Sequence, residues 1–539
     1  ADGRVARLAN GFTFTAPLSL SQVSPALGAQ AGGTRVSLYG RGFGPGLSAS
    51  IGGNAVAALQ IVSPTQATAL TPPGSPGAKP VAIARGGAAA GLPSAFTYFD
   101  PTSDLGGGSG GPLLGVLNVT ALEFSAFKQG GVQGATVQVV LPDSSILAAL
   151  TDANGQITFS DPRLVLPVQV TAMKASYDAI TVTNVATANL TVGLSGPPGP
   201  PPPPPDPPPP PPPPPQPASV AGHVYGFKLA PGTVLSGTQR AVARVAIARA
   251  GIYSLPPFAS AVQFKTVTTD GAGYLYDQLY SLSPTTFYAV FGIEDSATQP
   301  STFEPILLGV RRGVQPDPAR PVTDADIILD THLDQSLDVA VLDPPGTGGG
   351  HDAFVDLDLG QSGAIPLDRA LQNSDPYHLR FTHLPQAAGQ GFVFVDQYGR
   401  WTGSGIATPV TIYLRRVFGD LSGGVTLGPL LPFPVVQPVS NGVFSWTLAA
   451  SALQPNLEQL DVSDSAGNQD TSWAVLLPGP LRSIAMPDVL RARLAKGTHG
   501  FSIVSSVAPS FDFAHWNYAD LYSGSWTAYS YAAGSFTVP

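Results

Sequence analysis

The residues best placed for chemistry are two aspartates, Asp356 and Asp358, in the segment FVDLDLG. In a β-strand, residues i and i+2 project from the same face, so the two carboxylates could share one cation. Calcium takes six to eight oxygen ligands, and loop carbonyl oxygens would have to complete its shell. The pair therefore offers a structural calcium site, against the plainer interpretation of a solvated polar strand face. No other cofactor is expected.

Patterns typical of enzymes are weak. Residues 107–111 read GGSGG and formally satisfy G-x-S-x-G, but a nucleophile elbow needs an apolar strand before it and a helix after it. Here glycines precede the serine and a proline follows. The sequence has no H-E-x-x-H motif and no cysteine, so zinc–thiolate sites, thiol catalysis and disulfides are excluded. We therefore expect a protein that is not an enzyme.

Aromatic residues gather near the end of the chain, where nine of the 26 residues from 511 to 536 are Phe, Trp or Tyr. Aromatic side chains dominate protein cores and subunit interfaces, and stacked rings also bind sugars. We expect a core or interface role, with glycan binding as the alternative. The candidate residues are Trp516, Tyr518, Tyr522, Trp526 and Tyr529.

Composition narrows the class of protein further. Lys and Arg number 26 and Asp and Glu 35, which gives a net charge of -9 without a basic stripe, so nucleic acid is a poor partner. Charged residues make up only 11% of the chain, which favours a static extracellular surface. Because apolar stretches are interrupted, many of them by proline, we expect no transmembrane helix.

The strand signals are short segments rich in Val, Ile, Thr and aromatic residues, bounded by Gly, Pro, Asn or Asp. The chain also contains 61 glycines and 57 prolines, so turns are frequent. One helix is expected, in MPDVLRARLAKG at 486–497. The fold class is therefore all-β, with several sandwiches in series.

Residues 17–100 contain a set of spaced motifs: VSLYGRGFG at 36–44, IGG at 51–53, TPPG at 71–74 and a closing AFTY at 95–98. This pattern resembles the IPT/TIG family of immunoglobulin-like domains. The resemblance implies a β-sandwich whose last, aromatic strand returns to the core.

The segment 1–16 ends much as that domain does, since Phe12-Thr13-Phe14 aligns with Phe96-Thr97-Tyr98. It is either the last strand of a preceding domain of the same kind or a free strand that completes a neighbouring molecule. On the second interpretation, Phe12 and Phe14 are interface residues.

Two further segments are similar to the carboxypeptidase regulatory-like (transthyretin-like) sandwich. In 116–194 the pattern is VQGATVQVVLP followed by TDANGQITFS, and 218–343 repeats the turn as TTDGAGYLYDQL. A glycine-rich linker is expected at 101–115. Eighteen prolines among the 21 residues from 197 to 217 predict a polyproline II rod of roughly 65 Å within 195–217.

These expectations divide the chain at 16, 100, 115, 194, 217 and 345, with 346–539 forming one large sandwich or two small ones. We expect a non-enzymatic structural protein of the bacterial cell surface or extracellular space, a stalk or a subunit of a self-assembling fibre. Its partners would be further copies of itself or other surface proteins. The alternatives are an adhesin that binds glycans through its C-terminal aromatics and, further off, a carbohydrate-acting enzyme with accessory modules.

Overall fold

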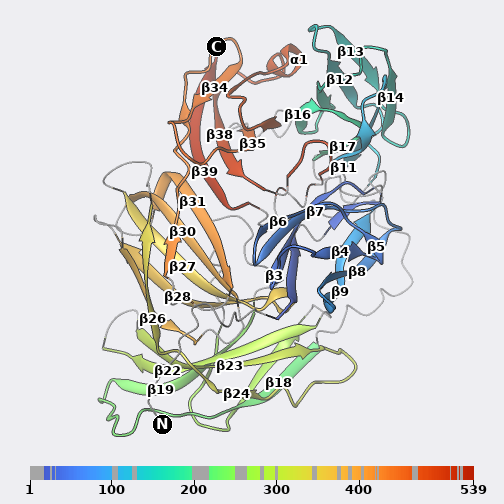
Figure 1. Ribbon diagram of the computed structural model, residues 1–539. Helices are drawn as coiled ribbons and strands as arrows, with labels where there is room; N and C mark the ends of the chain where they lie inside the picture. Colours follow the sequence, from blue (N-terminus) through green and yellow to red (C-terminus); the bar gives the residue numbers. More distant parts are fainter. Residues whose placement is uncertain are drawn as a thin grey trace, which may run out of the picture. The chain divides into compact units, whose positions relative to one another are not determined.

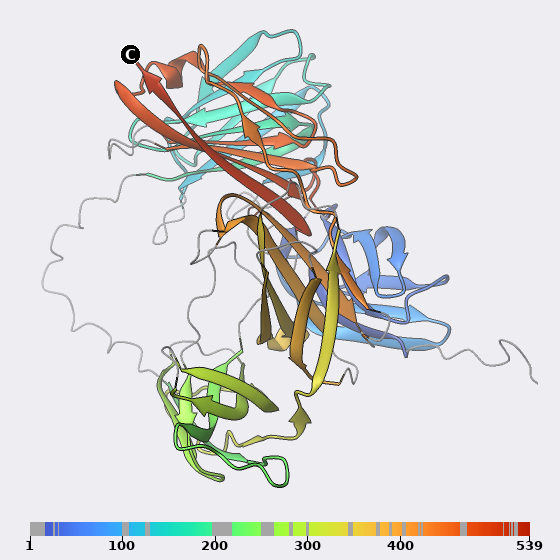
Figure 2. The ribbon, with the colours of Figure 1, turned by 90° about the vertical axis from the view of Figure 1, so that its left-hand side faces the viewer.

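The computed structural model consists almost entirely of β-strands in several sheets (Figures 1 and 2), which confirms the all-β prediction. Two compact units divide the chain, Ala1–Asp100 and Pro101–Pro539. No helix in the described part is long and apolar enough to cross a membrane. The structure describes residues 17–24, 27–30, 32–99, 107–123, 130–196, 218–248, 264–279, 284–297, 301–342, 349–372, 378–386, 391–401, 406–418, 421, 424–463, 472–509, 511–516, 518, 521 and 526–539.

The first unit is a sandwich of two sheets, with strand orders β1-β3-β7-β6 and β2-β9-β8-β4-β5. Its last strand, β9, carries the predicted aromatic pair into the core, where the rings of Phe96 and Tyr98 meet edge to face at 5.0 Å. The Tyr98 hydroxyl donates to the carbonyl oxygen of Pro72 at 2.5 Å. The strands are β1 (Ser19–Ser24), β2 (Leu27–Ala29), β3 (Arg35–Arg41), β4 (Ser48–Ile51), β5 (Asn54–Ala55), β6 (Ala57–Ser63), β7 (Gln66–Leu70), β8 (Gly77–Arg85) and β9 (Ala88–Phe99).

Residues 107–196 form the second sandwich. One sheet has the order β10-β17-β11-β14, and the strands β13-β12-β15-β16 form the other layer. The strands are β10 (Gly108–Pro112), β11 (Val116–Glu123), β12 (Thr136–Val140), β13 (Ile146–Leu150), β14 (Gln156–Ser160), β15 (Val168–Met173), β16 (Ala179–Val185) and β17 (Thr187–Leu194). The expected linker at 101–115 is wrong for 108–112, because this glycine-rich segment pairs with β17 as an edge strand.

Residues 218–333 form the third sandwich, with sheets β21-β18-β24 and β20-β19-β22-β23-β25 around a core of its own. Its predicted end at 345 is wrong, because 335–341 form a strand that pairs in the next sandwich. The strands are β18 (Ala218–Tyr225), β19 (Gln239–Ile247), β20 (Lys265–Val267), β21 (Gly273–Leu279), β22 (Thr285–Asp295), β23 (Thr302–Val314), β24 (Ile327–Ile328) and β25 (Thr331–His332).

The described strands of the rest of the chain form two pairs of facing sheets, in line with the alternative of two small sandwiches. The fourth (335–427) has the sheet β29-β26-β32 and the layer β31-β30-β27-β28; the fifth (435–539) has β33-β34-β37 and β36-β35-β38-β39. The expected helix is a single turn, α1 (Asp488–Arg491). The strands are β26 (Gln335–Val341), β27 (Gly350–Asp358), β28 (Ala364–Gln372), β29 (His378–Leu384), β30 (Gly391–Trp401), β31 (Ile406–Phe418), β32 (Val425–Leu427), β33 (Val435–Val436), β34 (Val443–Thr447), β35 (Leu457–Ser463), β36 (Trp473–Pro478), β37 (Ser483–Ala485), β38 (Gly497–Val507) and β39 (Ala528–Val538).

One twelve-stranded sheet joins three of these sandwiches, in the order β13-β12-β15-β16-β36-β35-β38-β39-β31-β30-β27-β28. The second sandwich meets the fifth where β16 pairs with β36 in parallel, residues 179–182 against 473–476. The fifth meets the fourth where β39 pairs with β31, residues 528–531 against 410–413. Segments nearly 300 residues apart are therefore hydrogen-bonded neighbours. The second, fourth and fifth sandwiches share one sheet and are not independent domains.

Trp473 lies on β36 at the junction of β16 with β36 and contacts β16. It is 1% exposed, and its indole Nε1 donates to the Thr181 hydroxyl of β16 at 2.8 Å. We expect Trp473→Ala to lower the free energy of unfolding by about 3–5 kcal/mol, because it leaves a large cavity. Trp473→Phe should cost about 1–2 kcal/mol, since the hydroxyl loses its buried donor. Urea unfolding measures both costs, and hydrogen exchange should show lost protection in β16. Unchanged protection in β16 for the Ala variant would contradict this coupling.

Candidate functional site

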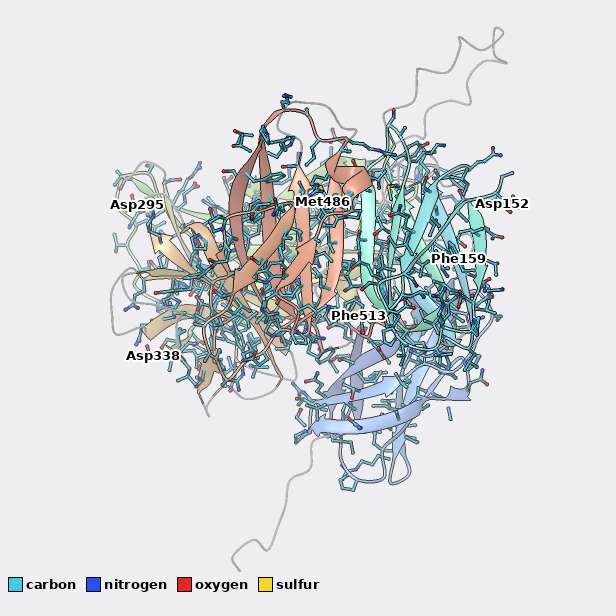
Figure 3. All side chains as sticks on the ribbon, turned by 90° about the horizontal axis from the view of Figure 1, so that it is seen from above. Asp152, Phe159, Asp295, Asp338, Met486 and Phe513 are labelled. Carbon is cyan, nitrogen blue, oxygen red and sulfur yellow. The ribbon has the colours of Figure 1, made fainter. Side chains whose placement is uncertain are left out.

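Four of the predicted aromatic residues lie in a hydrophobic core that three sandwiches share. Trp516, Tyr518, Trp526 and Tyr529 are each at most 6% exposed and pack with the interior of the second sandwich and with strands of the fourth. Their rings meet edge to face, at 5.2 Å for Trp516 and Tyr518 and at 4.6 Å for Trp526 and Tyr529. Phe159 and Phe513 belong to the same core (Figure 3).

These rings therefore act as packing residues, and their use at an interface stays a prediction. The remaining candidates, Phe12, Phe14 and Tyr522, lie outside the described residues, as does the proline run from 197 to 217.

Two glycines allow the aromatic segment to reach the second sandwich. A Cβ on Gly107 would lie 2.5 Å from the indole Cδ2 of Trp516, and one on Gly108 would lie 2.8 Å from the carbonyl oxygen of Phe513. The backbone N–H of Trp516 donates to the Gly108 carbonyl oxygen at 3.1 Å. The glycines that suggested a linker are needed because the indole packs directly on this backbone.

Asp356 and Asp358 both lie on β27 and both are buried, 2% and 6% exposed. The interpretation of a solvated strand face is therefore wrong for both. The Asp358 Oδ1 accepts the N–H of Gly360 at 2.8 Å, and burial raises the pKa of Asp358 above its ordinary value. Within the described ranges, no three His, Asp or Glu side chains form a group able to hold a metal ion. The calcium site stays a prediction.

A row of buried polar side chains crosses the twelve-stranded sheet, and sequence reasoning missed it. Strand register places its members opposite one another in turn, which puts them on the same face. Each is at most 2% exposed. The row, named here the polar row, is Glu458, Ser505, Ser530, Thr411, Tyr398 and His351.

Glu458 anchors one end of the polar row. Its Oε2 accepts from the Ser505 hydroxyl at 2.5 Å and from the indole of Trp446 at 3.2 Å, and its Oε1 lies 2.8 Å from a guanidinium nitrogen of Arg482. Burial raises the pKa of Glu458 to about 8, although Ser505 and Arg482 oppose the shift. Burial thus favours the protonated form of this carboxyl at neutral pH, against the donors that favour the ionised form.

His351 ends the row on the other side. Its Nδ1 lies 2.8 and 2.9 Å from the two carboxylate oxygens of Asp396, and both side chains are 0% exposed. The Tyr398 ring packs on the imidazole at a centroid distance of 4.8 Å and stacks on Phe433. A histidine–aspartate pair resembles part of a catalytic triad, but here it is enclosed in the core without access for a substrate, so its chemistry is structural.

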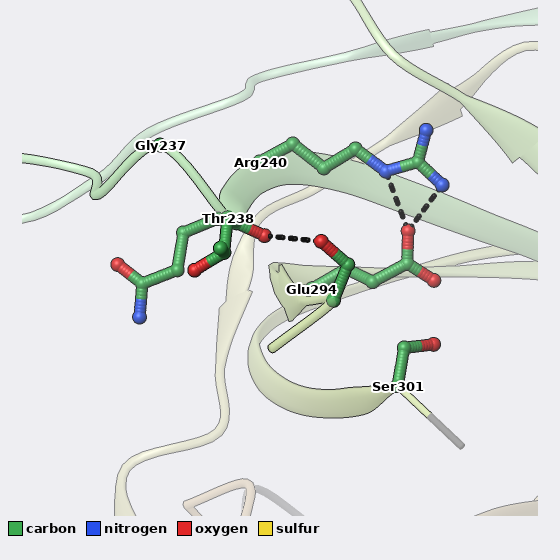
Figure 4. A pocket seen from close by; sticks show the side chains of 7 residues that line it. Gly237, Thr238, Arg240, Glu294 and Ser301 are labelled. Atoms are coloured by element: carbon green, nitrogen blue, oxygen red, sulfur yellow. Dashed lines mark hydrogen bonds and ion pairs between the residues drawn. The ribbon is translucent and has the colours of Figure 1, made fainter. Parts of the chain in front are cut away.

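The third sandwich carries a polar pocket of about 420 Å³ (Figure 4). Arg240 Nε donates to Glu294 Oε2 at 2.6 Å, and Arg244 Nη2 donates to Oε1 at 2.8 Å. These guanidinium groups, Arg244 first, lower the pKa of Glu294. The charges in this pocket pair with one another, and we assign it no ligand. It is lined by Gly237, Thr238, Gln239, Arg240, Glu294, Ser296 and Ser301.

The raised pKa of Glu458 predicts how stability depends on pH. The folded chain keeps this proton up to about pH 8, whereas an unfolded glutamate loses it near 4.5. The contribution of Glu458 to the free energy of unfolding is therefore fully present below about pH 4.5 and is lost as the pH rises through about 8. We expect Glu458→Gln to remove a fall of about 3–5 kcal/mol between these values.

Urea unfolding of both proteins at several values of pH measures this difference. Glu294→Gln is the matched control, because its lowered pKa places its titration below the same window. An equally steep fall in the Glu458→Gln protein would show that another group is responsible.

Comparison with known proteins assigns a family to one part of the chain. The IPT/TIG domain family matches residues 18–98, which confirms the resemblance predicted for 17–100. The resemblance of 116–194 and 218–343 to carboxypeptidase regulatory-like domains is not confirmed, although both segments lie in sandwiches. No curated protein matches the chain.

Among solved structures, the Bacillus anthracis TIE protein is 11% identical, with 77% of this chain and 74% of that one covered and a TM-score of 0.12. A streptococcal ancillary pilin is 13% identical, with 50% and 80% covered and a TM-score of 0.14. The protein SGBP-B, from a xyloglucan utilization locus of Bacteroides uniformis, is 11% identical, with 50% and 69% covered and a TM-score of 0.16. With TM-scores this low, these similarities carry no argument about function.

Proposed function

We propose that the protein is a non-enzymatic structural protein of the bacterial cell surface or extracellular space, a stalk or a subunit of a self-assembling fibre. The observation that carries this proposal is the twelve-stranded sheet with its shared aromatic core. Flexible joints let domains rotate, whereas a continuous ladder of hydrogen bonds holds neighbouring sandwiches in one orientation. A rigid body of this kind suits a load-bearing role.

The adhesin and enzyme alternatives have less support. The adhesin alternative needs exposed aromatic rings, and the four described candidates are buried. The enzyme alternative needs a concave site with two free carboxylates. The described pocket contains one carboxylate, paired to two arginines.

Pulling on both ends of the chain in a single-molecule force experiment tests the load-bearing role. We expect the first unit to unfold on its own and the second, fourth and fifth sandwiches to open in one event. An independent sandwich of 90 residues releases roughly 30 nm of chain, so a merged event is far longer. A series of separate steps of roughly 30 nm would contradict the proposal. Trp473→Ala should break the merged event into smaller ones.

A further inference from the structure

Among the described residues, the twelve-stranded sheet ends in two edge strands of opposite character. At one end, β28 carries Pro366, Asp368 and Arg369, and a proline and charges prevent another strand from adding to an edge. At the other end, β13 reads ILAAL, and no charged residue lies between Asp143 and Asp152. One edge is thus protected and the other is open to pairing.

The backbone of β13 is arranged for a further strand. It pairs with β12 over its whole length without a register shift, and the flanking bonds run from Leu141 N–H to the Ser145 carbonyl and from Thr151 N–H to the Ala135 carbonyl. Antiparallel bonds alternate, so every second residue of β13 bonds to β12. The N–H and C=O groups of Ile146, Ala148 and Leu150 therefore point to the open edge.

The side chains of the same three residues are exposed. Ile146 is 58% and Leu150 63% exposed, and Ala148 lies between them on the same face. An exposed apolar edge strand of this kind is a template on which another strand can pair.

We propose that β13 pairs with β13 of a second copy of this chain, antiparallel about a two-fold axis through Ala148. In this register Ala148 lies opposite Ala148 and Ile146 opposite Leu150. The three residues whose backbone groups point outwards then pair with one another, which gives about six hydrogen bonds. The side-chain pairs across the new ladder are apolar.

A second copy fits this edge because the strand matches itself. Two chains of net charge -9 repel each other in general, and β13 itself offers an uncharged strand as the place of contact. At its flank the charge of Asp143 is paired with Arg163, whose guanidinium also donates to the Ser145 hydroxyl at 2.8 Å. An isologous contact closes at two copies and continues the two twelve-stranded sheets into each other. The inference adds a two-copy contact to the self-association within the proposed function. Because this contact closes at two copies, growth of a fibre needs a second, different contact, and the inference does not depend on the load-bearing role.

The absence of cysteine allows a direct test by crosslinking in the full chain. Directly opposite residues of a hydrogen-bonded pair lie about 5.5 Å apart at Cα, which a disulfide spans. We expect Ala148→Cys to form a disulfide-linked dimer under mild oxidation. The matched control is Ala149→Cys, whose side chain faces the interior and which lies opposite Leu147, so it should stay monomeric.

Sedimentation of the unmodified protein and of Ala148→Lys supplies a second readout. Two like charges would stand directly opposite at the axis, and we expect the dimer to be lost while circular dichroism and thermal unfolding stay unchanged. A monomeric parent protein, or crosslinking through residue 149 but not 148, would overturn the proposal. A dimer that survives Ala148→Lys would place the contact elsewhere. The force experiment on a single chain reads the stalk role separately, so either proposal can fail alone.

Discussion

Backbone hydrogen bonding at the sheet edges is the constraint on which this architecture depends. Three separate sandwiches would each present bare edge strands, and bare edges invite unwanted pairing. Joining β16 to β36 and β39 to β31 removes four such edges at once. The shared core then forms beneath the junctions, because a continuous sheet gives a set of described aromatic residues a common surface to cover: Phe511, Phe513, Trp516, Tyr518, Trp526 and Tyr529.

A sheet buried on both faces imposes a second requirement, that its polar side chains find partners within the protein. The polar row meets it at its two ends, with bonds from Ser505 and Trp446 to Glu458 and with the pairing of His351 and Asp396, whereas the buried hydroxyl of Ser530 has no partner among the described residues. A buried polar group without a hydrogen-bond partner lowers the stability of the fold. When such groups do have partners, they favour the strand register that brings the partners together. The row crosses the junction of β39 and β31 at Ser530 and Thr411, where four residue pairs form the ladder between two sandwiches.

Local patterns made the first sandwich predictable, since its motifs, turns and closing strand all lie within about 80 residues. The strand character of the described part of residues 107–539 was equally predictable from the sequence. The domain limits were not, because residues 108–112 become a strand only through β17 and the Trp516 ring. Asp356 and Thr411 each stand between two apolar residues, which in a single sequence is typical of a strand with one face in water. Only pairing with strands distant in the sequence covers that face, and the neighbouring residues in the sequence do not indicate this pairing.

The junction of β16 with β36 also determines the order of events during synthesis. Thr183 and its partner Leu476 are 293 residues apart, so at 5–20 residues per second the edge of β16 waits roughly 15–60 s for its neighbour. Closing so long a loop carries an entropic cost that must be met before the contact stabilises anything. The nascent chain therefore holds an unfinished sheet while these 293 residues are made. The edge of β16 is covered only after residues 473–476 have been made.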